Sequence, residues 1–255
     1  MSVEISCIIP AYENLDLFAR CLASVCAQSE VAVEIIVSDD SRTDAVRTFT
    51  LALAAAYPSI RHIAGPRSGN PVDNWNHGLD AAHAPVALLV HHDEFLIDPL
   101  FLRRAVDAMQ RGPVAVMGHT AVIGMRRASR FGLVSAVFRR WSGRIWWLPL
   151  FNWIGPTAAL VFRTPMRFDP ALVQLVDIDF YLRVLAKGDL TILDGLCVGS
   201  LGHHGASITS RIDPDAAARL DLATLAARTP PAIGGWQRRI CLSCLAARSW
   251  LRQWR

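Results

Sequence analysis

The stretch LLVHHDE, residues 88–94, decides how this chain folds and where its chemistry lies. A short run of Leu and Val is typical of a buried parallel strand, and ligands in open α/β sheets bind just beyond the carboxyl ends of such strands. The run ends in two imidazoles and two carboxylates, so we expect Asp93 and Glu94 to lie at a ligand site. Oxygen ligands with imidazole nearby suit Mg²⁺ or Mn²⁺ better than a closed structural zinc.

Helix capping is the alternative interpretation of these acidic residues. Asp98 precedes Pro99, and Asp at the N-cap followed by Pro at the first helical position is a common helix start. This explains Asp98, but it leaves Asp93 five residues too early to cap the helix. For His91 and His92 two alternatives stay open, a contact with ligand or metal and an ordinary hydrogen-bonded side chain at a strand end.

Short apolar runs alternate with helical periodicity through the first half of the chain, which is the pattern of βαβ units. The predicted strands there are residues 3–10, 33–37, 60–64 and 86–90, and the predicted helices are residues 15–29, a segment ending at 57, 73–84 and 99–111. In the second half we predict strands at 114–123, 157–162 and 190–193, a helix at 177–187 and two C-terminal helices. The fold class is therefore α/β, with a mixed, mainly parallel sheet flanked by helices and a C-terminal helical appendage.

Length and composition fit one large domain, because 255 residues with 52% hydrophobic content can form a sizeable core. The longest apolar stretch, residues 145–162, is interrupted by two prolines, an asparagine and a glycine, so we predict no membrane span. No basic region followed by an apolar core begins the chain, and we expect a cytoplasmic location. The six cysteines follow neither a disulfide framework nor a zinc spacing, which fits reduced thiols.

Positive charge gathers in two zones of a chain whose net charge is only +4. Residues 108–168 contain nine arginines and no acidic residue, and the chain after Asp221 contains six arginines and no acidic residue. These zones predict anionic partners, but neither carries a motif for nucleic acid, and we expect no nucleic-acid partner. From Trp236 onward a helix would place tryptophans on one face beside arginines, which indicates either an interfacial helix on the inner face of an anionic membrane or a helix packed on the domain.

A second acidic strand end, Asp39 and Asp40, follows the second predicted strand and lies at the same edge of the sheet as Asp93. A carboxylate after an early strand of a nucleotide-binding unit commonly accepts a hydrogen bond from base or ribose. The hydroxyls of Ser41 and Thr43 also favour a helix N-terminus at this point, and capping explains them better than it explains two adjacent aspartates.

Five segments in order carry a family resemblance: residues 8–28, 34–44, 76–94, 155–163 and 176–183, which read IIPAYENLDLFARCLASVCAQ, EIIVSDDSRTD, NHGLDAAHAPVALLVHHDE, GPTAALVFR and VDIDFYLR. Together they resemble family 2 glycosyltransferases, and the resemblance covers roughly residues 3–205. It implies a Rossmann-like GT-A fold over residues 1–210, with a nucleotide-sugar half at 1–112 and an acceptor half at 113–210. Residues 211–255 would follow this domain as C-terminal helices, with the two alternatives given above for the helix after Trp236.

The resemblance also implies site residues. Those that match the nucleotide-sugar pocket are Pro10, Ala11, Tyr12, Glu13, Asp39, Asp40, Asn70, Asn76 and His92. Those that match the site of a manganese or magnesium ion are Asp93, His91, His203 and His204. Those that match the acceptor region are Gly155, Pro156, Thr157 and Arg183. The chain departs from the family pattern where His91 and Glu94 replace aspartates and where Trp75 replaces an arginine.

Asp177 matches the family's general base, six residues before Arg183. Val176 replaces the glutamate that usually precedes the base, so Asp179 is a second candidate. On a helix the two aspartates project about 200° apart, and they cannot both face one cleft. We expect Asp177 to face the acceptor and Asp179 to be an exposed first-turn carboxylate near the positive end of the helix dipole.

The resemblance implies an inverting transfer of sugar from a nucleoside-diphosphate sugar, UDP foremost, to a hydroxyl of a saccharide or lipid-linked acceptor. It places this activity in bacterial cell-surface polysaccharide or glycolipid synthesis. Two alternatives remain: a noncatalytic, membrane-associated relative that binds nucleotide, and a sugar nucleotidyltransferase. The second would need a Gly-rich phosphate loop near the N-terminus, and residues 10–14 do not form one.

Overall fold

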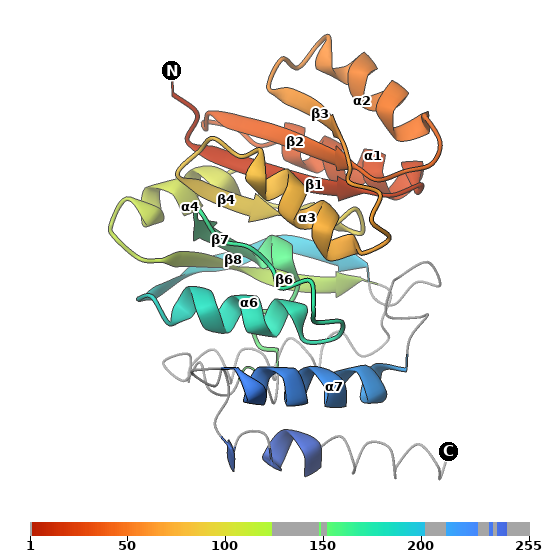
Figure 1. The fold of residues 1–255 in the computed structure, drawn as a ribbon. Coiled ribbons are helices and arrows are strands. Elements are labelled where there is room, and N and C mark those ends of the chain that lie inside the picture. The colour runs from red at the N-terminus through yellow and green to blue at the C-terminus, as the bar shows by residue number, and fades with distance from the viewer. Residues whose placement is uncertain are drawn as a thin grey trace.

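A computed structural model describes residues 2–123, 148, 152–201, 213–228, 235–236 and 239–243. Its centre is one eight-stranded sheet with the strand order β3-β2-β1-β4-β7-β6-β8-β5. Helices cover both faces of this sheet (Figure 1). The predicted α/β class with a mixed, mainly parallel sheet is confirmed.

The parallel half of the sheet consists of the four strands that the sequence predicts. They are β1 (Ile5–Ala11), β2 (Val33–Asp39), β3 (Ile60–Ala64) and β4 (Val86–Leu89). β1 pairs in parallel with both β2 and β4, and β2 pairs in parallel with β3. Their carboxyl ends therefore meet at one edge of the sheet, where the segments following β1, β2 and β4 come together.

The second half of the sheet is mixed. It consists of β7 (Leu160–Arg163), β6 (Ala115–Ile123), β8 (Leu190–Leu201) and β5 (Glu94–Leu96). β7 lies antiparallel between β4 and β6, and β5 is an edge strand antiparallel to β8. Two predictions are corrected here. The sequence analysis missed β5, and the segment predicted as one strand begins as a 3-10 helix, η2 (Thr157–Ala159), before β7.

Two apolar clusters pack against opposite faces of the sheet. The helices are α1 (Leu15–Cys26), α2 (Ala45–Ala54), α3 (Pro71–Asp80), α4 (Phe101–Met109), α6 (Val176–Leu185) and α7 (Pro214–Ala227). Residues of α1, α2 and α4 form one cluster, and residues of α3, α6 and α7 form the other. Figure 1 shows α7 lying alongside α6, on the side away from the parallel strands.

The starts of α1 and α3 lie within two residues of the predicted positions, whereas the start of α4 differs from the predicted capping arrangement. Asn14 caps α1 and Asn70 caps α3 through side-chain oxygens that accept from Leu17 N and Val72 N. Asp98 does not cap a helix that starts at Pro99: α4 starts at Phe101, and Asp98 Oδ1 accepts from the N–H of Leu100 at 2.9 Å. The acid still satisfies a backbone donor just before the helix, as a cap would.

Within the described part of the chain, no helix has the length and apolar character needed to cross a membrane. The described cysteines, which are Cys7, Cys21, Cys26, Cys197 and Cys241, are all free thiols. Most of the predicted interfacial helix after Trp236 lies outside the described residues.

The close packing of α3 on β1 predicts a stability effect for Gly78. A Cβ there would lie 2.5 Å from Cγ2 of Ile8, which is fully buried and cannot move away. We expect Gly78→Ala to lower the free energy of unfolding by about 2 kcal/mol in urea titrations, because overpacking outweighs the helix propensity of Ala. In an Ile8→Ala background the contact at 2.5 Å is absent and the nearest atom is Ser38 Cβ, at 3.3 Å, so the same substitution should cost much less. Equal effects in both backgrounds would contradict this contact.

Candidate active site

Glu94 ties the turn after β4 to the segment that enters β7. Its side chain is 5% exposed, and Oε2 accepts hydrogen bonds from His91 N (3.0 Å), Ala158 N (3.1 Å) and the Thr157 hydroxyl (3.2 Å). A buried carboxylate that accepts several donors is well stabilised in its charged form. Glu94 therefore fixes the backbone of this turn in addition to facing the predicted metal site.

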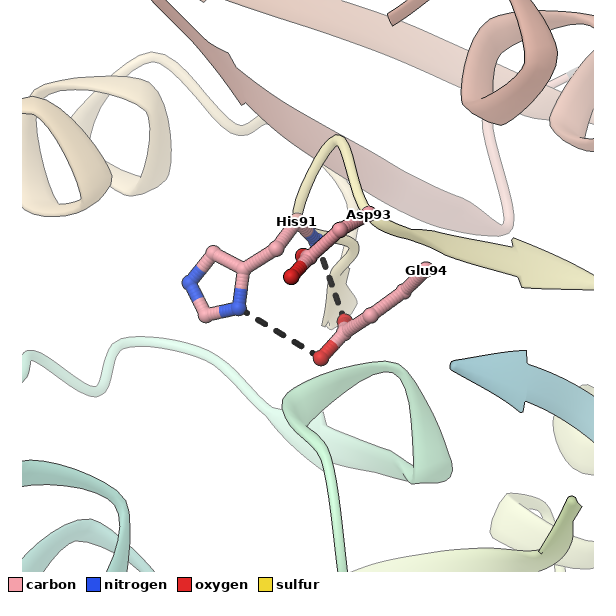
Figure 2. A group of neighbouring side chains, drawn as sticks. All are labelled: His91, Asp93 and Glu94. Carbon is pink, nitrogen blue, oxygen red and sulfur yellow. Dashed lines mark hydrogen bonds and ion pairs between the residues drawn. The ribbon is translucent and has the colours of Figure 1, made fainter. Parts of the chain in front are cut away.

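His91 lies above this carboxylate, with its ring toward Glu94 (Figure 2). Its Nδ1 is 3.1 Å from the Thr157 hydroxyl and 3.5 Å from Glu94 Oε1, and its ring packs at 4.5 Å between centroids on Trp75. Burial alone would lower the pKa of His91, but the charge and hydrogen bonding of Glu94, with Asp177 and Asp93, raise that pKa to about 9. Without a metal ion the ring is therefore a cation at neutral pH.

Three side chains of this turn could hold a metal ion. One ligand atom each from His91, Asp93 and Glu94 lie within 4.8 Å of one another (Figure 2). The ring nitrogen that faces the two carboxylates is Nδ1, 3.5 Å from Glu94 Oε1, while the buried Nε2 has no hydrogen-bond partner among the described residues. Two carboxylates and an imidazole fit Mn²⁺ or Mg²⁺. His203 and His204, the other predicted metal ligands, lie outside the described residues.

Asp177 lies in the first turn of α6, close enough to His91 and Glu94 for their charges to affect its pKa. Burial raises the pKa of Asp177 to about 6, opposed by the charge of His91 and reinforced by that of Glu94. Its buried Oδ1 has no hydrogen-bond partner among the described residues. One turn later Tyr181 donates from its hydroxyl to the carbonyl of Gly155 at 3.1 Å, which fixes the predicted acceptor segment against α6.

Asp179 has a different environment. The prediction that it is exposed is wrong: its side chain is completely buried, because its two oxygens contact Arg183 Nε at 2.8 Å and the guanidinium of Arg228. Both oxygens are thus engaged in ion pairs, whereas Asp177 keeps an oxygen without a partner. Arg183, predicted at the acceptor, is held by Asp179 on the same helix.

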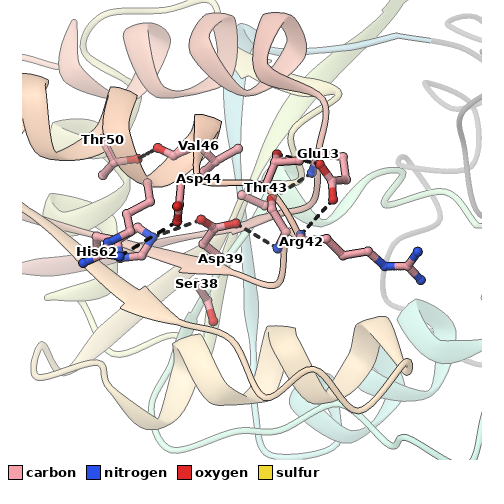
Figure 3. Close-up of polar contacts among 12 residues, drawn as sticks. Glu13, Ser38, Asp39, Arg42, Thr43, Asp44, Val46, Thr50 and His62 are labelled. Carbon is pink, nitrogen blue, oxygen red and sulfur yellow. Dashed lines mark hydrogen bonds and ion pairs between the residues drawn. The ribbon is translucent and has the colours of Figure 1, made fainter.

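The turn after β2 is a hydrogen-bonded frame (Figure 3). Asp39 accepts from Ser41 N at 3.0 Å through Oδ1 and lies 3.0 Å from His62 Nε2 through Oδ2. Asp40 Oδ1 accepts from the backbone N–H of Arg67 at 2.6 Å, in the loop that follows β3. Asp39 therefore orders the turn, and Asp40 joins it to the neighbouring loop.

Glu13 closes this frame from the loop after β1. Its carboxylate accepts from Arg42 N at 2.7 Å and from the Thr43 hydroxyl at 2.8 Å, and its φ of 56° turns the chain sharply. Pro10 and Ala11 end β1, and the side chain of Tyr12 is 44% exposed beyond them.

The predicted asparagines are engaged in structural contacts. Asn70 donates to the carbonyl of Pro170 at 3.0 Å, and Asn76 both donates to and accepts from the backbone of Phe168, at 2.9 and 2.8 Å. Both amides thus join α3 to the segment that precedes α6. The carbonyl of Pro156 accepts the N–H of Ala159 within η2.

A family model for Glycosyl transferase family 2 matches residues 6–160 of the chain. This chain belongs to glycosyl transferase family 2. The match contains both acidic strand ends and the η2 segment, although α6 and α7 follow it. The sequence resemblance and the expected GT-A fold are therefore confirmed, and the family membership rests on more than one motif.

Two curated relatives show how this family 2 chain compares with longer proteins. It is 29% identical over 203 residues to the uncharacterized protein MT1568 of Mycobacterium tuberculosis, covering 72% of this chain and 62% of that protein. It is 33% identical over 106 residues to the succinoglycan biosynthesis protein ExoO of Rhizobium meliloti, covering 41% of this chain and 29% of that protein. The chain thus spans less than two thirds of the length of both relatives.

Two solved structures share the fold of this family 2 chain. TarS 1-349 of S. aureus in complex with UDP-GlcNAc superposes with a TM-score of 0.67 and 17% identity, covering 96% of this chain and 72% of TarS 1-349. The mannosyltransferase PcManGT of Pyrobaculum calidifontis, in complex with GDP-Man and Mn²⁺, gives a TM-score of 0.67 and 16% identity, covering 96% of this chain and 73% of that chain.

The sequence did not predict two contributors to the site, the ring of Trp75 beside His91 and the carboxylate of Asp221 behind α6. Thr157 was predicted at the acceptor, and its hydroxyl contacts His91 and Glu94. Asp221 could have been noticed as an acid among the apolar residues of α7 that are buried. The contact of Trp75 with His91 joins two different segments of the chain and left no sequence signal.

The charge of His91 predicts a pH-dependent stability. Its folded pKa, about 9, lies above the ordinary value of 6.5, so its stabilising effect is complete below pH 6.5 and is lost as the pH rises through 9. In chelator-treated protein, we expect the free energy of unfolding to fall by roughly 2–3 kcal/mol more in wild type than in His91→Asn between pH 7 and pH 9.5. Urea titrations at both pH values measure this, and parallel curves for the two proteins would contradict the charged ring.

Proposed function

We propose that this chain transfers a sugar from a nucleoside-diphosphate sugar to an acceptor hydroxyl, with inversion at the anomeric carbon. One observation carries the proposal. Asp177 has a carboxylate oxygen without a hydrogen-bond partner among the described residues, and its charge interacts with those of His91 and Glu94. A candidate base and a candidate metal site thus share one edge of the sheet. Transfer chemistry needs that combination, because one group accepts a proton while another neutralises the leaving group.

The donor half supports a nucleoside-diphosphate sugar, with UDP as the first nucleotide to test. The frame around Asp39, Asp40 and Glu13 presents carboxylates at a strand end, where hydrogen-bond acceptors commonly meet a base or ribose. TarS and PcManGT were solved with UDP-GlcNAc and GDP-Man, two sugars of this chemical class. The name of ExoO, a succinoglycan biosynthesis protein, supports a saccharide or lipid-linked acceptor in cell-surface polysaccharide synthesis.

Asp93 and His91 would hold a divalent cation, with the Oε1 of Glu94 beside them. When bound, the cation supplies positive charge to the donor diphosphate. Asp177 accepts the proton of the acceptor hydroxyl while the acceptor oxygen bonds to the anomeric carbon, and the diphosphate leaves with its bonding electrons. The raised pKa of Asp177, about 6, leaves it ionised at neutral pH and makes it a stronger base than an ordinary carboxylate.

The C-terminal segment supports a peripheral position on the inner face of the cell membrane. Residues 235–236 and 239–243 are helical, and Trp236 and Ile240 are 51% and 41% exposed. Exposed apolar side chains in a basic, tryptophan-containing segment are what an interfacial helix requires.

Replacing the proposed base tests the mechanism. Asp177→Asn should lower kcat about 10²–10⁴-fold, because it removes the proton acceptor. The Kd for UDP, obtained from thermal shifts over a range of UDP concentrations, should stay within twofold of wild type. Asp189→Asn, an exposed acid just after α6, is the matched control and should transfer sugar normally. Full turnover by Asp177→Asn would reject the base assignment, and a wild type that binds nucleotide but transfers no sugar would favour a noncatalytic relative.

Replacing the proposed metal carboxylate tests the cation site. Asp93→Ala should weaken Mn²⁺ binding at least about tenfold, since it removes a charged oxygen ligand. Paramagnetic resonance of free Mn²⁺ during a titration measures the affinity directly, with Asp189→Asn again as the control. Unchanged Mn²⁺ affinity in Asp93→Ala would place the cation elsewhere.

A further inference from the structure

Helix α7 supplies a cap to α6 from outside that helix. The carboxylate of Asp221 is completely buried, and its Oδ2 accepts from the backbone N–H groups of Gln174 at 2.6 Å and Leu175 at 2.7 Å. Both of its oxygens also lie 3.1 Å from the N–H of Val173. These residues directly precede α6, whose own N-cap, Leu175, makes no side-chain cap bond. Asp221 therefore anchors the backbone of the three residues that lead into α6.

The end of α7 holds the same helix at a second point. Arg228, just past the last residue of α7, places its guanidinium between the carboxylates of Asp179 and Asp169. Asp179 is completely buried, and its other oxygen accepts from Arg183. Because a buried carboxylate needs cations or hydrogen-bond donors, Arg228 and Arg183 together stabilise Asp179 in this position.

Asp177 lies midway between these two attachment points. It follows the capped Leu175 by two residues and precedes the clamped Asp179 by two. Its own Oδ1 has no partner among the described residues, so no hydrogen bond at this atom fixes it. The position of Asp177 is then set by the backbone of the first turn of α6, which Asp221 and Arg228 hold from outside.

We propose that Asp221 and Arg228 are positioning residues for Asp177, and that α7 is a functional part of the acceptor half. This inference rests on the proposed transfer reaction. α7 lies beyond residues 6–160, where the family model matches, so the attachment is not a feature of the matched region. A displacement of about 1 Å at a reacting group can cost 10²-fold in rate, which makes such an attachment consequential for turnover.

A merely structural role for α7 predicts a different result. Loss of structure alone would weaken nucleotide binding and transfer together. Misplacement of Asp177 would lower kcat while the donor half, built on β1, β2 and β4, keeps its affinity. The ratio of these two effects separates the two cases.

The experiment compares Asp221→Ala and Arg228→Ala with wild type in full-length protein. We expect kcat to fall about 10- to 100-fold in each, with the KM for donor and the thermal shift with UDP within twofold of wild type. Asp221→Asn keeps one acceptor oxygen and should recover most of the rate. Arg228→Lys cannot reach both carboxylates with one ammonium group and should recover little. Arg219→Ala, an exposed arginine on α7, is the matched control and should behave as wild type.

Turnover within twofold of wild type in folded Asp221→Ala and Arg228→Ala would overturn the inference, as would equal losses of turnover and donor affinity. If the alanine variants do not fold, Arg228→Lys decides by the same two criteria. A wild type without transfer activity would overturn the proposed function itself. Failure of the proposed function can be distinguished from failure of this inference, because it is seen in the wild-type protein before any substitution is made.

Discussion

The buried carboxylate of Glu94 is the constraint on which the site depends. Removing a carboxylate from water is costly. Here that cost is offset by contacts with two backbone N–H groups, the hydroxyl of Thr157 and the ring of His91. Those partners come from both sides of the sheet's change of direction, the turn after parallel β4 and the 3-10 turn before antiparallel β7. One side chain thus fixes where the two halves of the molecule meet, and it fixes the backbone on which Asp93 stands.

Negative charge is in excess at this edge of the sheet, which favours the binding of a cation. Asp93, Glu94 and Asp177 carry three potential negative charges, and His91 supplies one positive charge. The raised pKa values of His91 and Asp177 are two responses to this arrangement, since the acids hold a proton on the imidazole and burial resists ionisation of Asp177. A divalent cation would replace the proton on His91, so metal binding should release a proton.

The parallel half could be predicted from the sequence because its information is local. β4 is a continuous apolar run and β1 and β2 are mostly apolar, and the acids at the ends of β2 and β4 stand out against that background. β5 and η2 could not, since each is only three residues long and is held by partners far away in the chain. The structural role of Glu94, which is to hold the turn after β4 against η2, could not be predicted either, because its donor at Ala158 lies 64 residues away in the sequence. Asp221 shows the intermediate case, since its place on an apolar stripe was visible while its partners, 46 to 48 residues earlier, were not.

The two halves of the molecule therefore hold their functional carboxylates by different means. In the proposed donor half, Glu13 and Asp39 are fixed within a frame of hydrogen-bonded turns at the ends of the parallel strands. In the proposed acceptor half, the turn that bears Asp177 is held by α7, an element more than 35 residues further along the chain. A change in α7 would then displace the proposed base without a change in the hydrogen bonds of Glu13 and Asp39. Variation in α7 would then alter turnover and acceptor geometry before it altered donor binding.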